Sequence, residues 1–319
     1  MPGTGLANAP SRLAIERIDA IDSTNDELLR RPSLTAGGAD AVWLVAAQQL
    51  RGRGRRQRGW QSTADGSLTA SFGRELALAP GTAARLGTLP LVAGIAIAET
   101  LADFGVDARL KWPNDLQRAA ATGGFAKIGG ILCEARGRSA ATRIVIGCGL
   151  NLRRPHHADT FGQPVAGLFD SLTAAALAAE RERLIVALGA ALLAATDTLF
   201  TAGFAPFRSR WQARDVLAGQ PIDVHRDGRV RPALACGIDD DGALLVEYLD
   251  AAVGDSAVSG TAAGGAAADG IAAGGTAAGG TASDGSAADG AAPGPPRRRE
   301  RLLSEEVSVR ALPVAPALR

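Results

Sequence analysis

The feature that most limits how this chain can fold is a tract near its C-terminal end, residues 251–296, built almost entirely from alanine, glycine and small polar residues. Repeats such as TAAGGAAADGIAAGGTAAGG contain almost no large apolar side chains, so burial cannot offset the conformational entropy that ordering would cost. The composition therefore predicts a disordered loop. Because the following segment, RRRERLLSEEVSVRAL, regains strand character, we expect the tract to be an insertion inside a C-terminal domain.

The remainder of the chain is long and apolar enough to form two folded domains. The full sequence has 319 residues, and 46% of them are hydrophobic. We expect a flexible tail over 1–14, a larger domain over 15–212, and a small barrel-like domain over 213–319 that the tract interrupts. The N-terminus carries no basic region followed by an apolar run, and no stretch approaches 18 uninterrupted apolar residues. These features indicate a soluble, unexported protein.

Cysteine and histidine are too sparse to suggest a metal centre. Cys133, Cys148 and Cys236 are odd in number, widely spaced and set in apolar sequence, which is typical of reduced core residues and not of a disulfide framework. The three histidines lack the spacing of ligand pairs. We expect no resident metal ion.

Hydrophobic patterning predicts alternating helices and strands in the larger domain. A turn at Ser23 or Thr24 leads into a short helix, another helix opens near Pro90, and an alanine- and leucine-rich stretch from Ser171 to Gly203 forms one long helix or two broken near Gly189. Strands are expected over DAVWLVAAQQ, GSLTASFGREL, ARLKWP, KIGGILCE and TRIVIGCGLNL, and short strands follow Trp211.

Residues 51–60, RGRGRRQRGW, form a dense basic segment. Its glycines let the backbone approach a ligand, arginine forks suit phosphate oxygens, and Trp60 offers a flat face for a base. Such a segment can bind either a nucleic-acid backbone or the phosphates of a small molecule. The formal net charge is only +1, from 34 basic and 33 acidic residues, which argues against a general polyanion binder.

Two lysines stand out because arginine occupies every other basic position. Lys111 begins KWPND, where Pro113 fixes the chain as it presents Asn114 and Asp115, and Lys127 begins KIGGILCE, where paired glycines leave room for a ligand. A compact ammonium can neutralise phosphate where a planar guanidinium would be too wide, and an aspartate can accept a proton or orient an amine. Each segment alone is also compatible with an ordinary strand and turn.

Taken in order, DSTND, QLRGRGRRQRGW, KWPND, KIGGILCE and IGCGLN resemble the motifs of the biotin protein ligases, also called biotin–[acetyl-CoA-carboxylase] ligases. The resemblance runs from Ile18 to Asn151 and continues more weakly through FAPFRSRW and GIDDDGALLVE to EEVSVR. It implies an α/β (α+β) catalytic domain with a mixed, largely antiparallel sheet, followed by an SH3-like β-barrel. It also implies an enzyme that uses biotin, ATP and Mg²⁺ to form biotinyl-5'-AMP. The biotin is then transferred to a lysine of a biotin carboxyl carrier protein.

The resemblance also implies a set of site residues. Catalytic roles fall to Lys127, Lys111, Asp115 and Arg55, with Lys127 meeting the biotin carboxylate and the α-phosphate, and Asp115 orienting or deprotonating the incoming lysine. The biotin-binding residues it implies are Ser23, Thr24, Asn25, Gln49, Gly52, Arg53, Gly54, Arg55, Lys127 and Gly130. Those for ATP and the adenylate are Arg53, Arg55, Arg56, Arg58, Trp60, Lys111, Asn114, Asn151 and Arg310.

The sequence departs from the family pattern at Arg51, where a small residue is usual, and at Gln57, where many members have glycine. The motifs begin by about residue 18, which leaves no room for an N-terminal winged-helix domain. We therefore expect no DNA partner, no membrane association and a cytoplasmic location. Two alternatives are a lipoate or octanoyl ligase on the related fold, and a nucleic-acid-binding protein that uses residues 51 to 60.

Overall fold

The computed structural model describes residues 12–34, 38–77, 82–137, 141–156, 158, 162–249, 299–303 and 308–311. The predicted insertion at 251–296 and all but the last residues of the predicted N-terminal tail lie outside this part of the chain.

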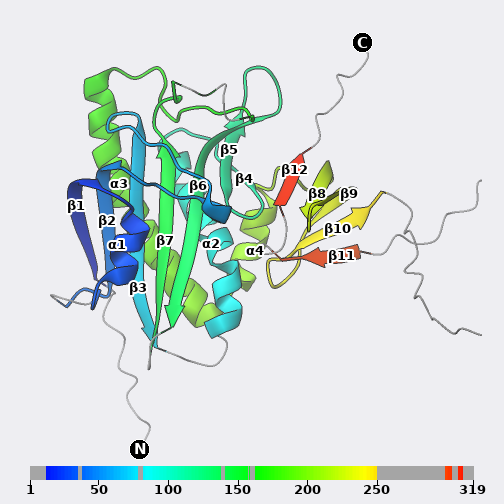
Figure 1. Cartoon of the computed structure of the whole chain (residues 1–319), viewed down its shortest axis with the longest axis horizontal. Helices are drawn as coiled ribbons and strands as arrows, with labels where there is room; N and C mark the ends of the chain where they lie inside the picture. The colour runs from blue at the N-terminus through cyan, green and yellow to red at the C-terminus, as the bar shows by residue number, and fades with distance from the viewer. Residues whose placement is uncertain are drawn as a thin grey trace, which may run out of the picture.

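A mixed sheet of seven strands forms the larger part of the molecule (Figure 1). Its strand order is β1-β2-β3-β7-β6-β5-β4, and only β1 and β2 pair in parallel. The strands are β1 (Leu13–Ile21), β2 (Ala41–Gln49), β3 (Ser67–Ala77), β4 (Arg109–Lys111), β5 (Asp115–Ala119), β6 (Phe125–Gly137) and β7 (Ala141–Asn151). The expected mixed, largely antiparallel sheet is confirmed.

Helices cover both faces of this sheet. The short helix α1 (Thr24–Arg30) lies on one face, and α2 (Thr82–Asp103) and α3 (Ala174–Ala202) pack together on the other (Figure 1). Strand β2 is buried on both sides, because Val42 and Leu44 belong to the small apolar cluster under α1 whereas Trp43 and Val45 belong to the main core. This two-sided burial explains the nearly continuous apolar run in its sequence.

Helix α3 is a single continuous helix that ends at Gly203, whose φ of 77° is the left-handed conformation that glycine adopts readily. Gly189 does not break it; glycine suits this position because a side chain there would come within 2.9 Å of Leu13 and Trp43. Both α2 and α3 are long and apolar enough to cross a membrane by length and composition alone. In this fold both form the helical layer against the sheet.

One expectation about secondary structure was wrong, and three elements were not predicted. Helix α2 begins at Thr82 and holds Pro90 in its interior, because its first turns bury Leu89 against the core and packing outweighs the lost hydrogen bond. Strand β1 was not predicted, since its apolar pattern is weak and its order comes from pairing with β2. Strand β5 and helix α4 (Ala205–Gln212) were not anticipated either.

The C-terminal part is a five-stranded antiparallel sheet in the order β11-β10-β9-β8-β12, as the expected SH3-like unit requires. Its strands are β8 (Pro221–Arg226), β9 (Arg229–Ile238), β10 (Leu244–Tyr248), β11 (Arg299–Leu302) and β12 (Ser308–Ala311), so the last two follow the insertion as predicted. The segment Arg214–Val216, which leads into β8, is joined to the large sheet by backbone hydrogen bonds with Leu110 of β4. The exact domain limits at 15, 212 and 213 remain predictions.

Candidate active site

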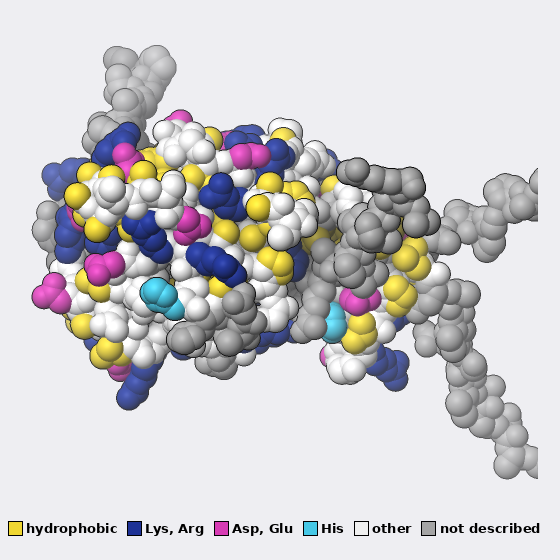
Figure 2. Space-filling model, turned by 90° about the horizontal axis from the view of Figure 1, so that it is seen from above, with side chains coloured by type: hydrophobic (Ala, Val, Ile, Leu, Met, Phe, Trp, Pro, Cys, Tyr) yellow, Lys and Arg dark blue, Asp and Glu magenta, His cyan; other side chains and the backbone are white. Residues whose placement is uncertain are grey.

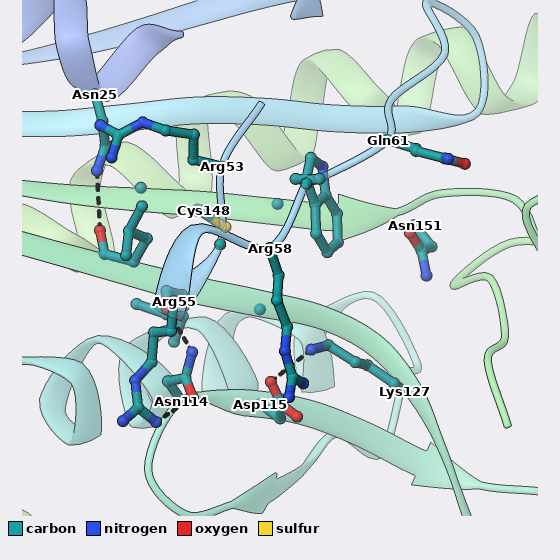
Figure 3. Close-up of a pocket in the computed structure, with 18 of the residues that line it drawn as sticks. Asn25, Arg53, Arg55, Arg58, Gln61, Asn114, Asp115, Lys127, Cys148 and Asn151 are labelled. Atoms are coloured by element: carbon teal, nitrogen blue, oxygen red, sulfur yellow. Dashed lines mark hydrogen bonds and ion pairs between the residues drawn. The ribbon is translucent and has the colours of Figure 1, made fainter. Parts of the chain in front are cut away.

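A cavity of about 350 Å³ lies at the end of the large sheet, where α1, the arginine-rich loop and strands β4 to β7 meet (Figure 3). It collects most of the residues singled out from the sequence. Those that line it are Ser23, Thr24, Asn25, Gln49, Arg53, Gly54, Arg55, Arg56, Arg58, Trp60, Lys111, Asn114, Asp115, Lys127, Gly130 and Asn151.

The arginine-rich loop folds over this cavity as a tight hairpin. Gly52 O accepts from Trp60 N at 2.8 Å, Gly54 N donates to Arg58 O at 2.7 Å, and a short 3₁₀ turn closes the tip. Gly52 is indispensable to this path, because a Cβ there would come within 2.6 Å of the Trp60 carbonyl. Arg56 has a φ of 55°, a left-handed conformation that is uncommon for a residue other than glycine.

At one end of the cavity, a polar network holds the first turn of α1 in place. Gln49 Oε1 accepts from the Thr24 amide at 2.7 Å and from its hydroxyl at 3.0 Å. Asn25 Nδ2 donates to Glu134 Oε2 at 2.7 Å, and its Oδ1 lies 2.6 Å from the Ser71 hydroxyl. Because all these side chains are buried or half-buried, their fixed dipoles can read the polar groups of a small ligand.

The same network reaches the loop through Arg53. Its guanidinium forms ion pairs with Asp26 of α1 and with Glu134 of β6, the latter at 3.3 Å. Glu134 therefore contacts both Asn25 and Arg53 (Figure 3 shows these two side chains side by side). The loop is held closed by carboxylates of the chain itself.

At the other end, the KWPND segment faces strand β6. Lys127 Nζ lies 2.6 Å from Asp115 Oδ1, and both side chains are about four-fifths buried. Asn114 Nδ2 donates to Ile131 O at 2.7 Å, while its Oδ1 accepts from Arg55 Nη1 at 3.3 Å. Two distant segments and the loop thus converge on one point, which sequence alone could not establish.

The glycines around the cavity have different tasks. Gly129 lets β6 pack against β7, since a Cβ there would come within 2.7 Å of the Gly149 carbonyl. Gly130 lines the cavity. A Cβ added there would lie 3.5 Å from the Lys127 side chain, an ordinary contact, so glycine at this position enlarges the cavity only slightly. Gly149 carries the Trp60 indole on its bare backbone. The sequence predicted that Gly129 and Gly130 together leave space beside Lys127, but only Gly130 does so.

Some predicted residues lie outside the cavity lining. Gly52 shapes the loop without lining the cavity, and Arg310 is placed only through the backbone of β12, paired with Asp223. Conversely, Glu134 and Cys148 were not anticipated as site residues. Glu134 is the last residue of the quoted KIGGILCE, but its role depends on two partners that are remote in sequence. Burial raises the pKa of the Cys148 thiol to about 12, so it is a neutral part of the cavity wall and not a nucleophile.

Positive charge dominates the cavity. Six of the lining residues are cationic, Arg53, Arg55, Arg56, Arg58, Lys111 and Lys127, whereas Asp115 is the one carboxylate among the residues that line it. The Trp60 Nε1 is buried and has no hydrogen-bond partner within the described part of the chain. This arrangement can hold two anions against each other beside a flat aromatic face, which is what joining a carboxylate to a phosphate requires.

Comparison with known proteins gives a consistent result. Residues 18–151 match the model of the biotin/lipoate A/B protein ligase family. The chain is 34% identical over 238 residues to the biotin–[acetyl-CoA-carboxylase] ligase of Paracoccus denitrificans, covering 70% of this chain and 90% of that protein. It is 36% identical over 233 residues to the bifunctional ligase/repressor BirA of Escherichia coli, covering 72% and 68%.

The fold is similar to a solved structure of the biotin protein ligase from Aquifex aeolicus in complex with biotin and ATP. The TM-score is 0.63, and the match covers 94% of this chain and 99% of that one. At 18% identity this likeness concerns the fold alone.

Proposed function

The chain belongs to the biotin protein ligases of the biotin/lipoate A/B protein ligase family, and we propose that its cationic cavity is where biotin and ATP react. The protein is an ATP-dependent biotin protein ligase. The observation that supports the site assignment is the convergence of Lys127, Asp115 and the arginine-rich loop on one cavity.

In the first step, an oxygen of the biotin carboxylate attacks the α-phosphorus of ATP, and pyrophosphate leaves. Lys127 neutralises the carboxylate and the α-phosphate, and Lys111 adds positive charge at the same phosphate. Arg55 is held in place by Asn114 and stabilises the charge that develops in the transition state. Trp60 stacks on adenine, with Asn151 beside it. Arg53 and Gly54 close the loop over biotin and so protect the mixed anhydride from water.

In the second step, a lysine amine of the carrier protein attacks the biotinyl carbonyl, and AMP leaves. The amine must be deprotonated and aimed, and Asp115 is the cavity carboxylate able to do this. In the structure Asp115 is paired with Lys127. Arrival of the biotin carboxylate offers Lys127 a second anion, which frees Asp115 to accept a hydrogen bond from the amine. The carrier is a biotin carboxyl carrier protein, and we place the reaction in the cytoplasm.

We treat Mg²⁺ as part of the nucleotide substrate. The described residues contain no cluster of three or more histidine, cysteine or carboxylate side chains that could hold a metal ion. Mg²⁺ is commonly bound through phosphate oxygens and few protein carboxylates, so it would enter as MgATP.

The direct test is to incubate the purified protein with biotin, MgATP and a carrier domain, and to measure the carrier by mass spectrometry. We expect a mass increase equal to one biotinyl group, which disappears when biotin or ATP is omitted. Substituting lipoate for biotin should give no product. Modification with lipoate at a comparable rate would contradict the proposed substrate.

A further inference from the structure

Arg143, near the start of β7, is a buried cation that does not line the cavity. Among the described residues it is the one charged residue that is fully buried, with an exposed fraction of 1%. A buried charge is costly unless its hydrogen-bonding groups are satisfied. The partners of this guanidinium therefore indicate what it does.

The Arg143 guanidinium joins the sheet to the C-terminal end of α1. In the sheet it pairs with Glu75, the residue directly opposite on β3, and its Nε lies 3.1 Å from Glu75 Oε1. Towards the helix, Nη1 donates to the carbonyls of Leu28, at 2.8 Å, and Arg31, and Nη2 donates to that of Pro32 at 3.3 Å. The last carbonyls of a helix have no partner within it, and the Leu28 carbonyl lacks the usual donor one turn later because Pro32 has no N–H. Arg143 thus completes the hydrogen bonding of this helix end.

The opposite end of α1 contributes Ser23, Thr24 and Asn25 to the cavity. Between its two ends the helix packs on β3 and β7 (Figure 1). Gly73 of β3 lets it approach closely, since a Cβ there would come within 2.9 Å of the Leu28 side chain. Apolar contacts of this kind have no preferred direction. The hydrogen bonds at the two ends therefore fix where the helix lies along its axis.

The fit at the cavity end leaves little room for α1 to move. Asn25 lies over the bare backbone of Gly147 in β7, where a Cβ would clash with the Asn25 amide. Its Nδ2 also donates to the Leu132 carbonyl of β6 at 3.1 Å. Gly147 lines the cavity and belongs to the same strand as Arg143, so a single strand forms part of the cavity wall and holds the far end of the helix. A shift of α1 along β7 would move Asn25 out of its place.

We propose that Arg143 is a positioning residue for the biotin end of the cavity. By holding the last carbonyls of α1 against β7, it places Ser23, Thr24 and Asn25 where they bind biotin. The inference rests on the proposed function. Because Arg143 lies outside the cavity, it acts on the affinity for biotin through α1 and leaves the chemical step to the residues that meet the reacting atoms.

The test is to replace Arg143 by lysine, which keeps the charge. A single ammonium cannot reach Glu75 and the helix carbonyls together, as the planar fork of N–H donors does. In biotin-dependent ATP–pyrophosphate exchange, the KM for biotin should rise about tenfold, while the KM for ATP and the rate at saturating biotin should stay within about twofold of the wild-type values. A mere loss of folded protein would lower the rate and leave both KM values unchanged.

Arg74→Lys is the matched control. Arg74 precedes Glu75 on β3 and is also largely buried, but it is paired with Asp197 of α3 on the other face of the sheet. This variant should leave both KM values unchanged. If Arg143→Lys does not fold, the double variant Glu75→Gln/Arg143→Gln removes both charges together, and it too should raise the KM for biotin.

An unchanged KM for biotin in a folded variant at position 143 would overturn the assignment. An equal rise in the KM for ATP, or an equal rise in the KM for biotin in Arg74→Lys, would also overturn it, because either result would mean a general loosening of the sheet. Absence of exchange in the wild-type protein would instead refute the proposed function itself.

Discussion

Lys127 illustrates how much of the site depends on the shape of a single side chain. It is one of two lysines in a chain with 34 basic residues, and its ammonium is held 2.6 Å from Asp115 in a largely buried position. An ammonium occupies far less space than a guanidinium and can approach two anions from one point. We therefore expect the function of this position to require lysine and not arginine.

Replacing Lys127 by arginine should lower the rate of adenylate formation about a hundredfold, corresponding to about 3 kcal/mol of lost transition-state stabilisation. The charge is retained, but the wider group would misplace the carboxylate and the phosphate. Biotin-dependent ATP–pyrophosphate exchange measures this directly. Arg17→Lys, at an exposed position of β1, is the control and should leave exchange unchanged. More than half of the wild-type rate in Lys127→Arg would exclude Lys127 from the reacting centre.

Asp215 makes a separate contribution to stability. Burial raises the pKa of its carboxyl group to about 6. The Leu217 amide, which donates to Oδ1 at 2.8 Å, lowers this pKa and so offsets part of the effect of burial. Its Oδ2 is buried without a hydrogen-bond partner among the described residues. The folded protein therefore binds a proton at this position more readily than the unfolded chain, whose carboxyl titrates near 3.8.

Because the folded-state pKa is raised, the stabilisation is complete below the unfolded pKa and is lost as the pH rises through about 6. Asp215→Asn should remove this dependence and increase the free energy of unfolding at pH 7 by on the order of 1–3 kcal/mol. Urea unfolding of both proteins at pH 5 and pH 7.5 measures the effect. The expectation fails if the wild-type and variant proteins lose stability equally between these two values.

At the level of elements, the arginine-rich loop is closed by a latch formed by Asp26, Glu134 and Arg53. The ion pairs tie the loop to α1 and to β6. Glu134 also fixes Asn25, so the loop and the first turn of α1 share one anchor. We therefore expect closing of the loop and shaping of the adjacent pocket to be coupled.

Glu134→Gln should loosen this loop, since the neutral amide cannot pair with Arg53. Trypsin cleaves after arginine, and the loop is rich in arginine, so mass spectrometry of the fragments should show faster cleavage within residues 51–58. Biotin together with ATP should restore protection. Glu182→Gln, which removes the ion pairs of Glu182 with Arg17 and Arg181, should leave the cleavage rate at the loop unchanged. Equal cleavage rates in both variants would mean that the latch does not control the loop.

At the scale of the whole molecule, the C-terminal sheet supports the site through Trp112. The indole of this residue is 2% exposed and donates from Nε1 to the Gly242 carbonyl at 3.0 Å. Gly242 lies in a turn that packs on α2, where a side chain would come within 2.6 Å of Leu91. Trp112, which lies between Lys111 and Pro113, is therefore held in place by the turn between β9 and β10 of the C-terminal sheet.

Trp112→Phe should lower the rate of adenylate formation about tenfold, because the loss of the indole N–H releases the segment that carries Lys111, Asn114 and Asp115. Trp43→Phe is the matched control. Its indole donates to the Ile185 carbonyl at the same 3.0 Å, but between β2 and α3. Both variants should lose about 1–3 kcal/mol of stability, measured by urea unfolding. Only the first should slow exchange, and equal rates would exclude a positioning role for Trp112.

Deletion of residues 255–292 should leave both folding and adenylate formation largely unchanged, because a tract so poor in large apolar side chains contributes little to any core. Thermal unfolding and pyrophosphate exchange of the deletion variant test this. A protein that no longer folds, or that no longer uses biotin, would show that the tract has an active role.

The amino-acid sequence by itself determined the class of fold, the ordered motifs and the chemistry of the site. Strands with continuous apolar runs, such as β2, and the capped helix α1 are recognisable because the residues that form them are local. The glycines and arginines of residues 51–60 likewise predict a loop that binds anionic ligands. The roles of the individual site residues remain predictions, although the fold brings nearly all of them to one cavity.

Only the tertiary structure decided what depends on remote partners. Strand β1 is ordered by its pairing with β2, and α2 passes through Pro90 because packing outweighs a local preference. Glu134 becomes part of the site only when Asn25 and Arg53 reach it. Such contacts join residues far apart in the chain, so no local pattern of side chains records them.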